Sequence, residues 1–289
     1  MAKTWLITGS AHGLGRAIAE VVLDHGDRLV ATARKTELLA ELQGRYGDRI
    51  AVATLDVTDA VAAQAAVKLA VDTFGRLDVL VNNAGFGSVA PFEQMGEDDF
   101  KAQIDTNFYG VVNLTRAALP VMRLQRSGYV INISSGAGRL GAPGMGAYHA
   151  AKFAVGGFTE AIAKEVAGFG VKVVAVEPGS MPTNWAPLAT KHAPTIMPDY
   201  EASVGHMLSM AQRLAGNEIG DLSKYAKVIF DLSRKDELPN HLLLGSDALF
   251  AVRMAEAARD KATAAWERVS QSTDRDDADL SFLQHLRLD

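Results

Sequence analysis

Short apolar runs alternate with longer amphipathic segments along most of this chain. The apolar runs predict strands at residues 5–7, 28–33, 50–55, 77–81, 129–133 and 171–176. Such continuous runs are typical of strands that are buried on both faces of a parallel sheet. Helical spacing of apolar residues predicts helices at residues 16–25, 60–74, 98–125 and 150–166. This alternation indicates an α/β fold with a doubly wound parallel sheet, in which helices cover both faces.

The regular alternation ends near residue 183. Residues 184–226 are rich in Met, Pro and other apolar residues, which suit an adaptable pocket wall and equally an ordinary core. Beyond them we expect a last short strand at residues 239–245, a helix at residues 247–268 and a polar tail whose residues 280–283 dock weakly. No repeat or low-complexity linker interrupts the chain, so the pattern predicts a single domain with a C-terminal helical extension.

Composition and charge exclude several classes of protein. The chain has 289 residues, no cysteine and a formal net charge of −5. The acidic balance argues against a nucleic-acid or anionic-membrane partner, and the lack of cysteine excludes disulfides, thiolate nucleophiles and cysteine-ligated zinc. The histidines show no metal-binding spacing, so no metal site is predicted. No apolar run approaches membrane-spanning length and no signal-peptide pattern opens the chain, which favours the cytoplasm.

Polar and glycine-rich segments follow the predicted strands. In a doubly wound sheet, ligands bind beyond the carboxyl ends of the strands. The glycine-rich turn at residues 8–15 follows the first strand and opens a helix, so its backbone amides can face a diphosphate. Its spacing, Gly-x-x-x-Gly-x-Gly, differs from the usual dinucleotide fingerprint. Asp56, residues 82–85, Ser135 and residues 178–179 follow other strands, and the sequence therefore predicts one ligand site at this edge.

Residues 134–152 carry the candidate acid–base chemistry. Tyr148 and Lys152 are one helical turn apart and share one face of a helix. A lysine ammonium at that position favours the phenolate, and we expect it to lower the tyrosine pKa from its usual value of about 10. Ser135, at the end of a strand, supplies a second hydroxyl for the same substrate oxygen. The trio suits proton transfer at a carbonyl or alcohol oxygen, although a Tyr-x-x-x-Lys pair alone is more often a solvated lysine beside a half-buried tyrosine.

Arg34 bears on the choice of cofactor. An NAD site carries an Asp or Glu near the end of the second strand, where it binds the ribose 2′-hydroxyl. Here that strand ends in Ala33, followed by Arg34 and Lys35. A guanidinium offers a planar fork to a phosphate, so Arg34 favours the 2′-phosphate of NADP(H) over NAD(H). A solvated surface arginine is the alternative.

Taken together, these motifs resemble those of the short-chain dehydrogenase/reductase family. The resemblance covers about the first 185 residues and is carried, in the family's order, by Thr8-Gly-x-x-x-Gly13-x-Gly15, Asp56-Val57, Asn82-Asn-Ala-Gly85, Asn107, Ser135, Tyr148-x-x-x-Lys152 and Pro178-Gly179 with Thr183. It implies a Rossmann-type dinucleotide-binding and catalytic domain at residues 1–250, with a substrate loop at residues 184–226. Residues 251–289 are expected to be a C-terminal helix and tail that pack on this domain or trail from it.

The resemblance implies four catalytic residues. Tyr148 would be the general acid–base, and Ser135 would orient and polarise the substrate oxygen. Lys152 would lower the tyrosine pKa while it binds the nicotinamide ribose. Asn107, which on its own chemistry is a buried amide satisfied by the backbone, would hold a water in a proton relay from Lys152 to solvent.

Cofactor contacts are implied in every loop at the sheet edge. The glycines of the first turn would flank the diphosphate, Asp56 would meet the adenine, and Thr183 would bind the carboxamide. The full set of expected contacts is Gly9, Ser10, His12, Gly13, Leu14, Gly15, Arg34, Asp56, Val57, Asn83, Ala84, Gly85, Tyr148, Lys152, Pro178, Gly179 and Thr183.

The predicted activity is hydride transfer between NADP(H) and a small carbonyl compound or secondary alcohol, with an apolar substrate favoured by residues 184–226. A non-catalytic regulator that senses NADP is one alternative, and a sensor has no physical need for the intact set Ser135, Tyr148 and Lys152. A second alternative is an epimerase or dehydratase of the family's extended branch. Members of that branch carry Gly-x-x-Gly-x-x-Gly near the N-terminus, and this chain lacks that motif. In the family, helices at residues 98–125 and 150–168 pair between subunits, which implies a homodimer or homotetramer.

Overall fold

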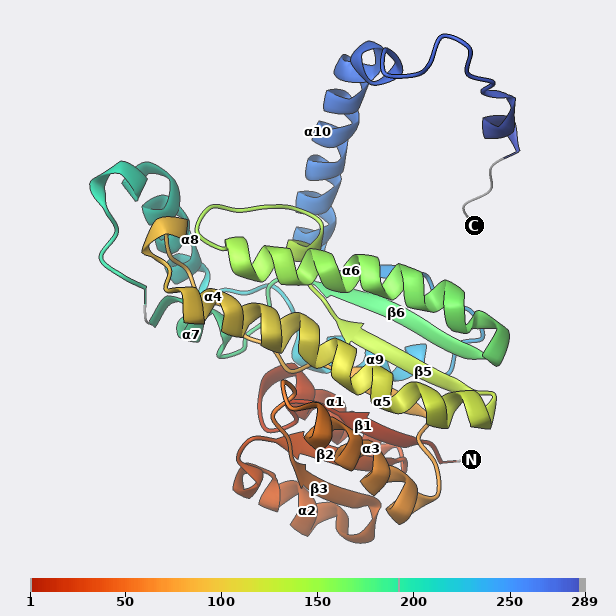
Figure 1. The fold of residues 1–289 in the computed structure, drawn as a ribbon. Coiled ribbons are helices and arrows are strands. Elements are labelled where there is room, and N and C mark those ends of the chain that lie inside the picture. Colours follow the sequence, from red (N-terminus) through yellow and green to blue (C-terminus); the bar gives the residue numbers. More distant parts are fainter. Residues whose placement is uncertain (1, 192, 286–289) are drawn as a thin grey trace.

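One parallel sheet forms the centre of the molecule. The computed structural model describes residues 2–191 and 193–285, and in this part of the chain seven strands pair in the order β3-β2-β1-β4-β5-β6-β7 (Figure 1). The strands are β1 Thr4–Ile7, β2 Arg28–Ala33, β3 Ile50–Thr54, β4 Val79–Asn82, β5 Gly128–Ile133, β6 Val171–Pro178 and β7 His241–Leu244. Every neighbouring pair is parallel. The strand order reverses between β1 and β4, which is where such sheets bind ligands.

Helices cover both faces of the sheet, as the alternating pattern predicted (Figure 1). The α-helices are α1 Gly13–Asp24, α2 Ala40–Tyr46, α3 Ala60–Phe74, α4 Glu97–Ile104, α5 Gly110–Gln125, α6 Gly146–Val166, α7 Trp185–Lys191, α8 His206–Leu214, α9 Leu222–Leu232 and α10 Ser246–Gln271. Asp59 caps α3, because its side chain accepts hydrogen bonds from the backbone N–H groups of Val61 and Ala62.

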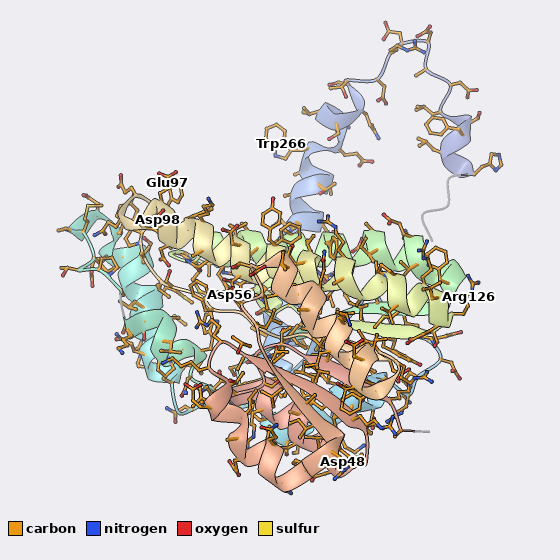
Figure 2. The ribbon with its side chains drawn as sticks, turned by 60° about the horizontal axis from the view of Figure 1, so that its bottom comes forward. Asp48, Asp56, Glu97, Asp98, Arg126 and Trp266 are labelled. Carbon is orange, nitrogen blue, oxygen red and sulfur yellow. The ribbon has the colours of Figure 1, made fainter. Side chains whose placement is uncertain are left out.

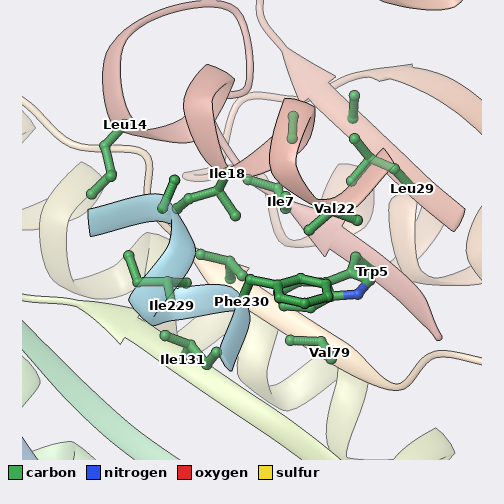
Figure 3. Packing of buried hydrophobic residues seen from close by; sticks show 14 of the residues in the cluster. Trp5, Ile7, Leu14, Ile18, Val22, Leu29, Val79, Ile131, Ile229 and Phe230 are labelled. Atoms are coloured by element: carbon green, nitrogen blue, oxygen red, sulfur yellow. The ribbon is translucent and has the colours of Figure 1, made fainter. Parts of the chain in front are cut away.

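Two apolar cores lie on opposite faces of the sheet. Successive residues of β1 point to opposite sides, so Trp5 and Ile7 enter the core under α1, α2 and α9, while Leu6 enters the core under α3 and α5. On the first side the rings of Trp5 and Phe230 stack with centroids 5.9 Å apart (Figure 3). Phe230 belongs to α9, which therefore completes the core beside α1.

Three helical segments differ from the sequence prediction. The expected helix at residues 98–125 is divided, because a π-helical turn, Asp105–Tyr109, joins α4 to α5. Helix α6 begins at Gly146 rather than residue 150, so it includes Tyr148. The segment at residues 184–226 contains α7, α8 and the start of α9 instead of an irregular loop.

The C-terminal region trails from the domain. Helix α10 packs at its start and then stands clear of the other elements, and Trp266 lies on the part that projects (Figures 1 and 2). The apolar residues of the tail remain exposed, by 48% at Leu280, 57% at Phe282 and 51% at Leu283. The docking expected for residues 280–283 is therefore wrong.

Candidate active site

The loops that follow β1 and β4 are joined at the carboxyl edge of the sheet. The Thr8 hydroxyl accepts hydrogen bonds from the backbone N–H groups of Asn83 and Ala84, each at 2.9 Å. The Asn83 amide donates in return to the Thr8 carbonyl oxygen at 2.9 Å. Asn83 and Ala84 thus brace the glycine-rich turn through their backbone N–H groups and the Asn83 side-chain N–H.

The glycines of the first turn are required by close approach. Gly9 and Gly13 have positive φ angles of 69° and 55°, which side chains rarely adopt. A Cβ at Gly15 would overlap the carbonyl oxygen of Gly9, and one at Gly13 would lie 3.3 Å from the Thr183 methyl group. The turn therefore meets the loop after β6, which places Gly13 and Thr183 together.

The other residues of the turn differ in where their side chains lie. The Ser10 hydroxyl donates to the Ile7 carbonyl oxygen at 2.8 Å and is buried. Leu14 is buried in the core under α1, whereas His12 is exposed at the start of α1. Of these three side chains, only that of His12 faces solvent beside the turn.

Asp56 and Arg34 lie near each other at the ends of β3 and β2. The Asp56 carboxylate accepts from the Thr58 N–H at 3.0 Å and the Thr58 hydroxyl at 2.7 Å. These hydrogen bonds hold the Asp56 pKa below its usual value against the effect of burial, and the nearby charge of Arg34 adds to them. Arg34 is exposed, so its guanidinium is accessible to an anionic ligand.

Tyr148 and Lys152 lie on one face of α6, as their spacing predicted. Both side chains are buried, and the Lys152 Nζ is 5.6 Å from the centre of the Tyr148 ring. The Lys152 ammonium donates to the Ile133 carbonyl oxygen at 2.9 Å, which ties α6 to the end of β5. The loop that follows β5 carries Ser135, whose hydroxyl interacts with that of Tyr148.

Burial shifts the pKa values of both residues. Desolvation raises the Tyr148 pKa to about 12, and the hydrogen bond with Ser135 opposes that rise. Desolvation lowers the Lys152 pKa to about 8. The expectation that Lys152 lowers the Tyr148 pKa is therefore wrong, because burial dominates that pKa and the group that opposes the rise is Ser135, not Lys152.

The Asn107 side chain binds the backbone. Its amide donates to the carbonyl oxygens of Phe86 at 2.7 Å and Gln103 at 2.8 Å, and its oxygen accepts from the Phe86 N–H at 3.2 Å. A Cβ at Gly85 would lie 2.5 Å from that oxygen and 3.6 Å from Lys152 Nζ. Asn107 thus fixes the loop after β4 beside Lys152, in agreement with the account of a buried, satisfied amide.

Trp185 is a residue of the site that sequence reasoning noted only as part of an apolar segment. Its ring lies against Tyr148, with centroids 5.1 Å apart. A Cβ at Gly87 would lie 2.8 Å from the Trp185 ring and 3.2 Å from the Tyr148 ring, so this glycine makes room for both. An apolar cluster that includes Val89, Met145 and Val204 surrounds Tyr148. The spacing of residues gives no signal for this contact, because it depends on how α7 packs.

A cavity of about 560 Å³ lies between α1 and the loop after β6, and it reaches the edge of the site at Gly13 and Thr183. Pro178 and Gly179 lie at the end of β6, and a Cβ at Gly179 would overlap the Asp247 carboxylate. Val57 is buried beneath the adjoining edge, against Gly110.

Within residues 2–191 and 193–285, no three His, Cys, Asp or Glu side chains are grouped to hold a metal ion. In the same ranges no helix combines the length and apolar character needed to cross a bilayer.

The comparison with known proteins identifies the class. The family model described as short chain dehydrogenase matches residues 3–193, and this chain belongs to that family of oxidoreductase enzymes. It is 44% identical over 258 residues to oxidoreductase BOA17 of Botryotinia fuckeliana, which covers 89% of this chain and 94% of the relative.

Two solved structures share the fold. A short-chain dehydrogenase from Streptomyces avermitilis is 38% identical with a TM-score of 0.87, over 95% of this chain and 100% of the other. A short chain dehydrogenase/reductase from Burkholderia phymatum, solved in complex with NAD, is 27% identical with a TM-score of 0.76, over 87% of this chain and 92% of the other.

Proposed function

We propose that this enzyme is an NADP(H)-dependent oxidoreductase that interconverts a carbonyl compound and a secondary alcohol. The observation that carries the proposal is the buried group of Ser135, Tyr148 and Lys152 at the sheet edge where the glycine-rich turn begins α1. A non-catalytic NADP sensor requires no such group.

The glycine-rich turn fits a dinucleotide. Gly9 and Gly15 bring backbone close to backbone, and Gly13 lies against the Thr183 side chain, so a Cβ at any of the three would be crowded. The turn opens directly into α1, whose first N–H groups favour an anion. When bound, the cofactor supplies or accepts the hydride. The Burkholderia phymatum relative was solved with NAD, and the same turn accounts for the diphosphate shared by NAD and NADP.

Preference for NADP(H) is proposed from Arg34. The residue follows β2 directly and is exposed, and the strand ends in Ala33 and not in the Asp or Glu that binds a 2′-hydroxyl in an NAD site. A guanidinium can bind the 2′-phosphate through two parallel hydrogen bonds.

Tyr148 is proposed to move the proton. With a pKa near 12 the phenol is protonated at neutral pH, which is the state needed to protonate the substrate oxygen during carbonyl reduction. Ser135 orients and polarises that oxygen, and Lys152, held by the Ile133 carbonyl, binds the ribose and supplies positive charge beside the phenol. Asn107 holds the loop beside Lys152 in place, and a water on its backbone would connect Lys152 to solvent.

The substrate is proposed to be apolar. The cluster around Tyr148 contains Trp185, Val89, Met145 and Val204, with Ile196, Met207 and Leu208 packed against it. Apolar side chains of this kind recognise a hydrocarbon body, while Ser135 and Tyr148 recognise its oxygen.

The assembly is proposed to be a homodimer or homotetramer in the cytoplasm. Tyr109, in the turn before α5, and Phe153, on α6, are 51% and 43% exposed, and these helices are the ones that pair between subunits in the family. An apolar contact with a second copy would cover both rings.

Tyr148→Phe tests the proposal. We expect the variant to bind NADPH as the natural protein does. Its kcat for reduction of an apolar ketone is expected to fall by about 10²–10⁴-fold, which is what general acid catalysis typically contributes. The matched control is Tyr46→Phe, because Tyr46 is also buried with a pKa raised to about 12, yet its hydroxyl binds Asp24 outside the site. Undiminished turnover in Tyr148→Phe would overturn the assignment.

A further inference from the structure

Helix α10 contacts two loops of the candidate site. We call residues 134–139 the Ser135 loop and residues 178–183 the Thr183 loop. The family match ends at residue 193, so α10, Ser246–Gln271, lies wholly outside the segment that the family model describes. Its contacts with the site were not anticipated from the sequence motifs.

The first turn of α10 holds the Thr183 loop. The Asp247 carboxylate accepts a hydrogen bond from the Ser180 N–H at 2.7 Å and another from the N–H of Ala248 at 2.9 Å. A Cβ at Gly179 would overlap this carboxylate, and one at Gly245 would lie 2.7 Å from it. Asp247 thus fills the space between β6 and β7 and fixes the backbone that leads to Thr183.

Residues of α10 between Ala248 and Arg259 hold the Ser135 loop. Ala248 lies 3.6 Å from the position that a Cβ would take at Gly136. Further along the helix, Glu256 forms an ion pair with the Arg139 side chain, and Arg259 donates to the Arg139 carbonyl oxygen. Both the side chain and the backbone at the end of the Ser135 loop therefore depend on α10.

Arg139 extends this connection into the sheet. Its guanidinium also lies 3.4 Å from the carboxylate of Glu177, which is fully buried at the end of β6. A buried carboxylate needs a compensating cation, and the guanidinium fork can serve two carboxylates at once. The contacts of Arg139 with Glu177 and Glu256 hold it between the sheet and α10.

Beyond these contacts α10 leaves the body of the protein. Every residue from 257 to 271 is exposed, and the helix projects away from the sheet (Figure 2). The polar contacts with the site are therefore concentrated between Asp247 and Arg259.

We infer that the first half of α10 positions the Ser135 loop and the Thr183 loop relative to each other, with Asp247 and Glu256 as positioning residues for the reaction. This inference rests on the proposed function, in which Ser135 orients the substrate oxygen, and on the role that the family resemblance implies for Thr183, which would bind the cofactor carboxamide. Asp247 then acts through the cofactor, and Glu256 acts through the substrate oxygen.

Steady-state kinetics of paired variants test the inference. Because a hydrogen bond to a charged group contributes about tenfold or more in an equilibrium, we expect Asp247→Asn to raise the KM for NADPH about tenfold, with kcat changed less than about twofold. Glu256→Gln is expected to lower kcat about tenfold and to leave the KM for NADPH unchanged. Rates are expressed per NADPH-binding site, counted by titration, so that loss of folded protein does not imitate a loss of kcat.

Two further variants complete the test. Arg259→Gln removes an exposed side chain, so it tests the Ser135 loop without endangering the fold, and it is expected to follow Glu256→Gln. Asp260→Asn, one turn beyond Glu256 and exposed, is the matched control and is expected to keep natural kcat and KM.

The outcomes separate this inference from the proposed function. Two outcomes would overturn the positioning roles, provided that Tyr148→Phe still loses turnover. In the first, Asp247→Asn and Glu256→Gln both keep the natural kcat and KM. In the second, both variants show the same change of kcat with an unchanged KM. Full turnover in Tyr148→Phe would overturn the proposed function instead.

Discussion

At Tyr148, burial opposes ionisation of the residue proposed to transfer the proton. The pKa of about 12 keeps the phenol protonated, and the Lys152 pKa of about 8 leaves most of the ammonium charged at neutral pH. This pair of states suits donation of a proton to a carbonyl oxygen. Spacing alone predicted that the two residues meet, but it could not predict which effect on the pKa would dominate, because that depends on burial.

Arg34 is the residue on which cofactor choice is proposed to depend. Its guanidinium is exposed beside Asp56, where the 2′-phosphate of NADP(H) would give it an anionic partner that NAD(H) lacks. We expect Arg34→Ala to raise the KM for NADPH at least about tenfold, since charge-assisted hydrogen bonds contribute about 1.5–3 kcal/mol, and to change the KM for NADH by less than about twofold.

The measurement is the ratio of kcat/KM for the two cofactors on one ketone. Lys35→Ala is the control, because the next residue is also exposed and cationic. Equal losses for NADPH and NADH would remove the 2′-phosphate role from Arg34.

Among the elements, the π-helical turn between α4 and α5 places Asn107 against the loop after β4. Because Asn107 binds both backbone groups of Phe86, Asn107→Ala leaves buried polar groups without partners. We expect this variant to lose about 1–3 kcal/mol of unfolding free energy along with turnover, as measured by urea unfolding and by kinetics.

The control for that element is Asn217→Ala. Asn217 is exposed and bonds only within its own turn, to the Arg213 carbonyl oxygen. If Asn107→Ala lost turnover but kept its natural unfolding free energy, the anchoring account would fail and a relay role alone would remain.

The strands could be predicted because each is a short apolar run. The residues at the carboxyl edge of the sheet could be predicted because a glycine or a polar residue follows each run. The predicted bounds of β2, residues 28–33, coincide with the strand observed. Helix α9 was missed, although Asp221 caps it and Tyr225, Ile229 and Phe230 have helical spacing. The apolar face of α9 is buried against α1 and Trp5, and a local sequence pattern carries no information about such long-range packing.

The residues of the candidate site also fall into those that a local motif reveals and those that only long-range packing brings together. Residues that act through backbone geometry, such as Gly13 and Gly15, were recognisable because their motif is local. Trp185 and Asp247 were not, since their contacts with Tyr148 and Ser180 join elements that are distant in the chain.

Across the whole molecule, buried charges connect helices to the sheet. His241 on β7 bonds Glu177 on β6 at 2.6 Å and Glu160 on α6 at 2.7 Å, while Arg139 faces Glu177 from the Ser135 loop. The hydrogen bond to Glu177 raises the His241 pKa against the effect of burial and of the Arg139 charge.

This raised pKa makes stability depend on pH. Protonated His241 stabilises the fold fully below its unfolded pKa of about 6.5, and this contribution is lost as pH rises through the higher folded value. We therefore expect the contribution of His241 to the unfolding free energy to fall from pH 6 to pH 9, by about 1.4 kcal/mol for each unit that the folded pKa is raised. Lys152, whose pKa burial lowers to about 8, acts in the opposite direction above that pH, so the effect of His241 is the difference between the natural protein and a variant without the imidazole.

Urea unfolding at both pH values measures the effect, with His241→Gln as the comparison. Over this range the natural protein is expected to lose more stability than the variant, or to gain less, because glutamine does not titrate. The same fall in both proteins would show that other groups cause the pH dependence.

The contacts of α10 also bear on how the protein is made. Arg139 meets Glu256, and Ser180 meets Asp247, so each loop needs a partner that is translated more than about 60 residues later. A nascent chain that has emerged from the ribosome through β6 already contains Ser135, Tyr148 and Lys152 but still lacks the helix that holds their neighbouring loops. Catalytic competence would then require synthesis through the first half of α10 and would not rise in proportion to the length of chain produced.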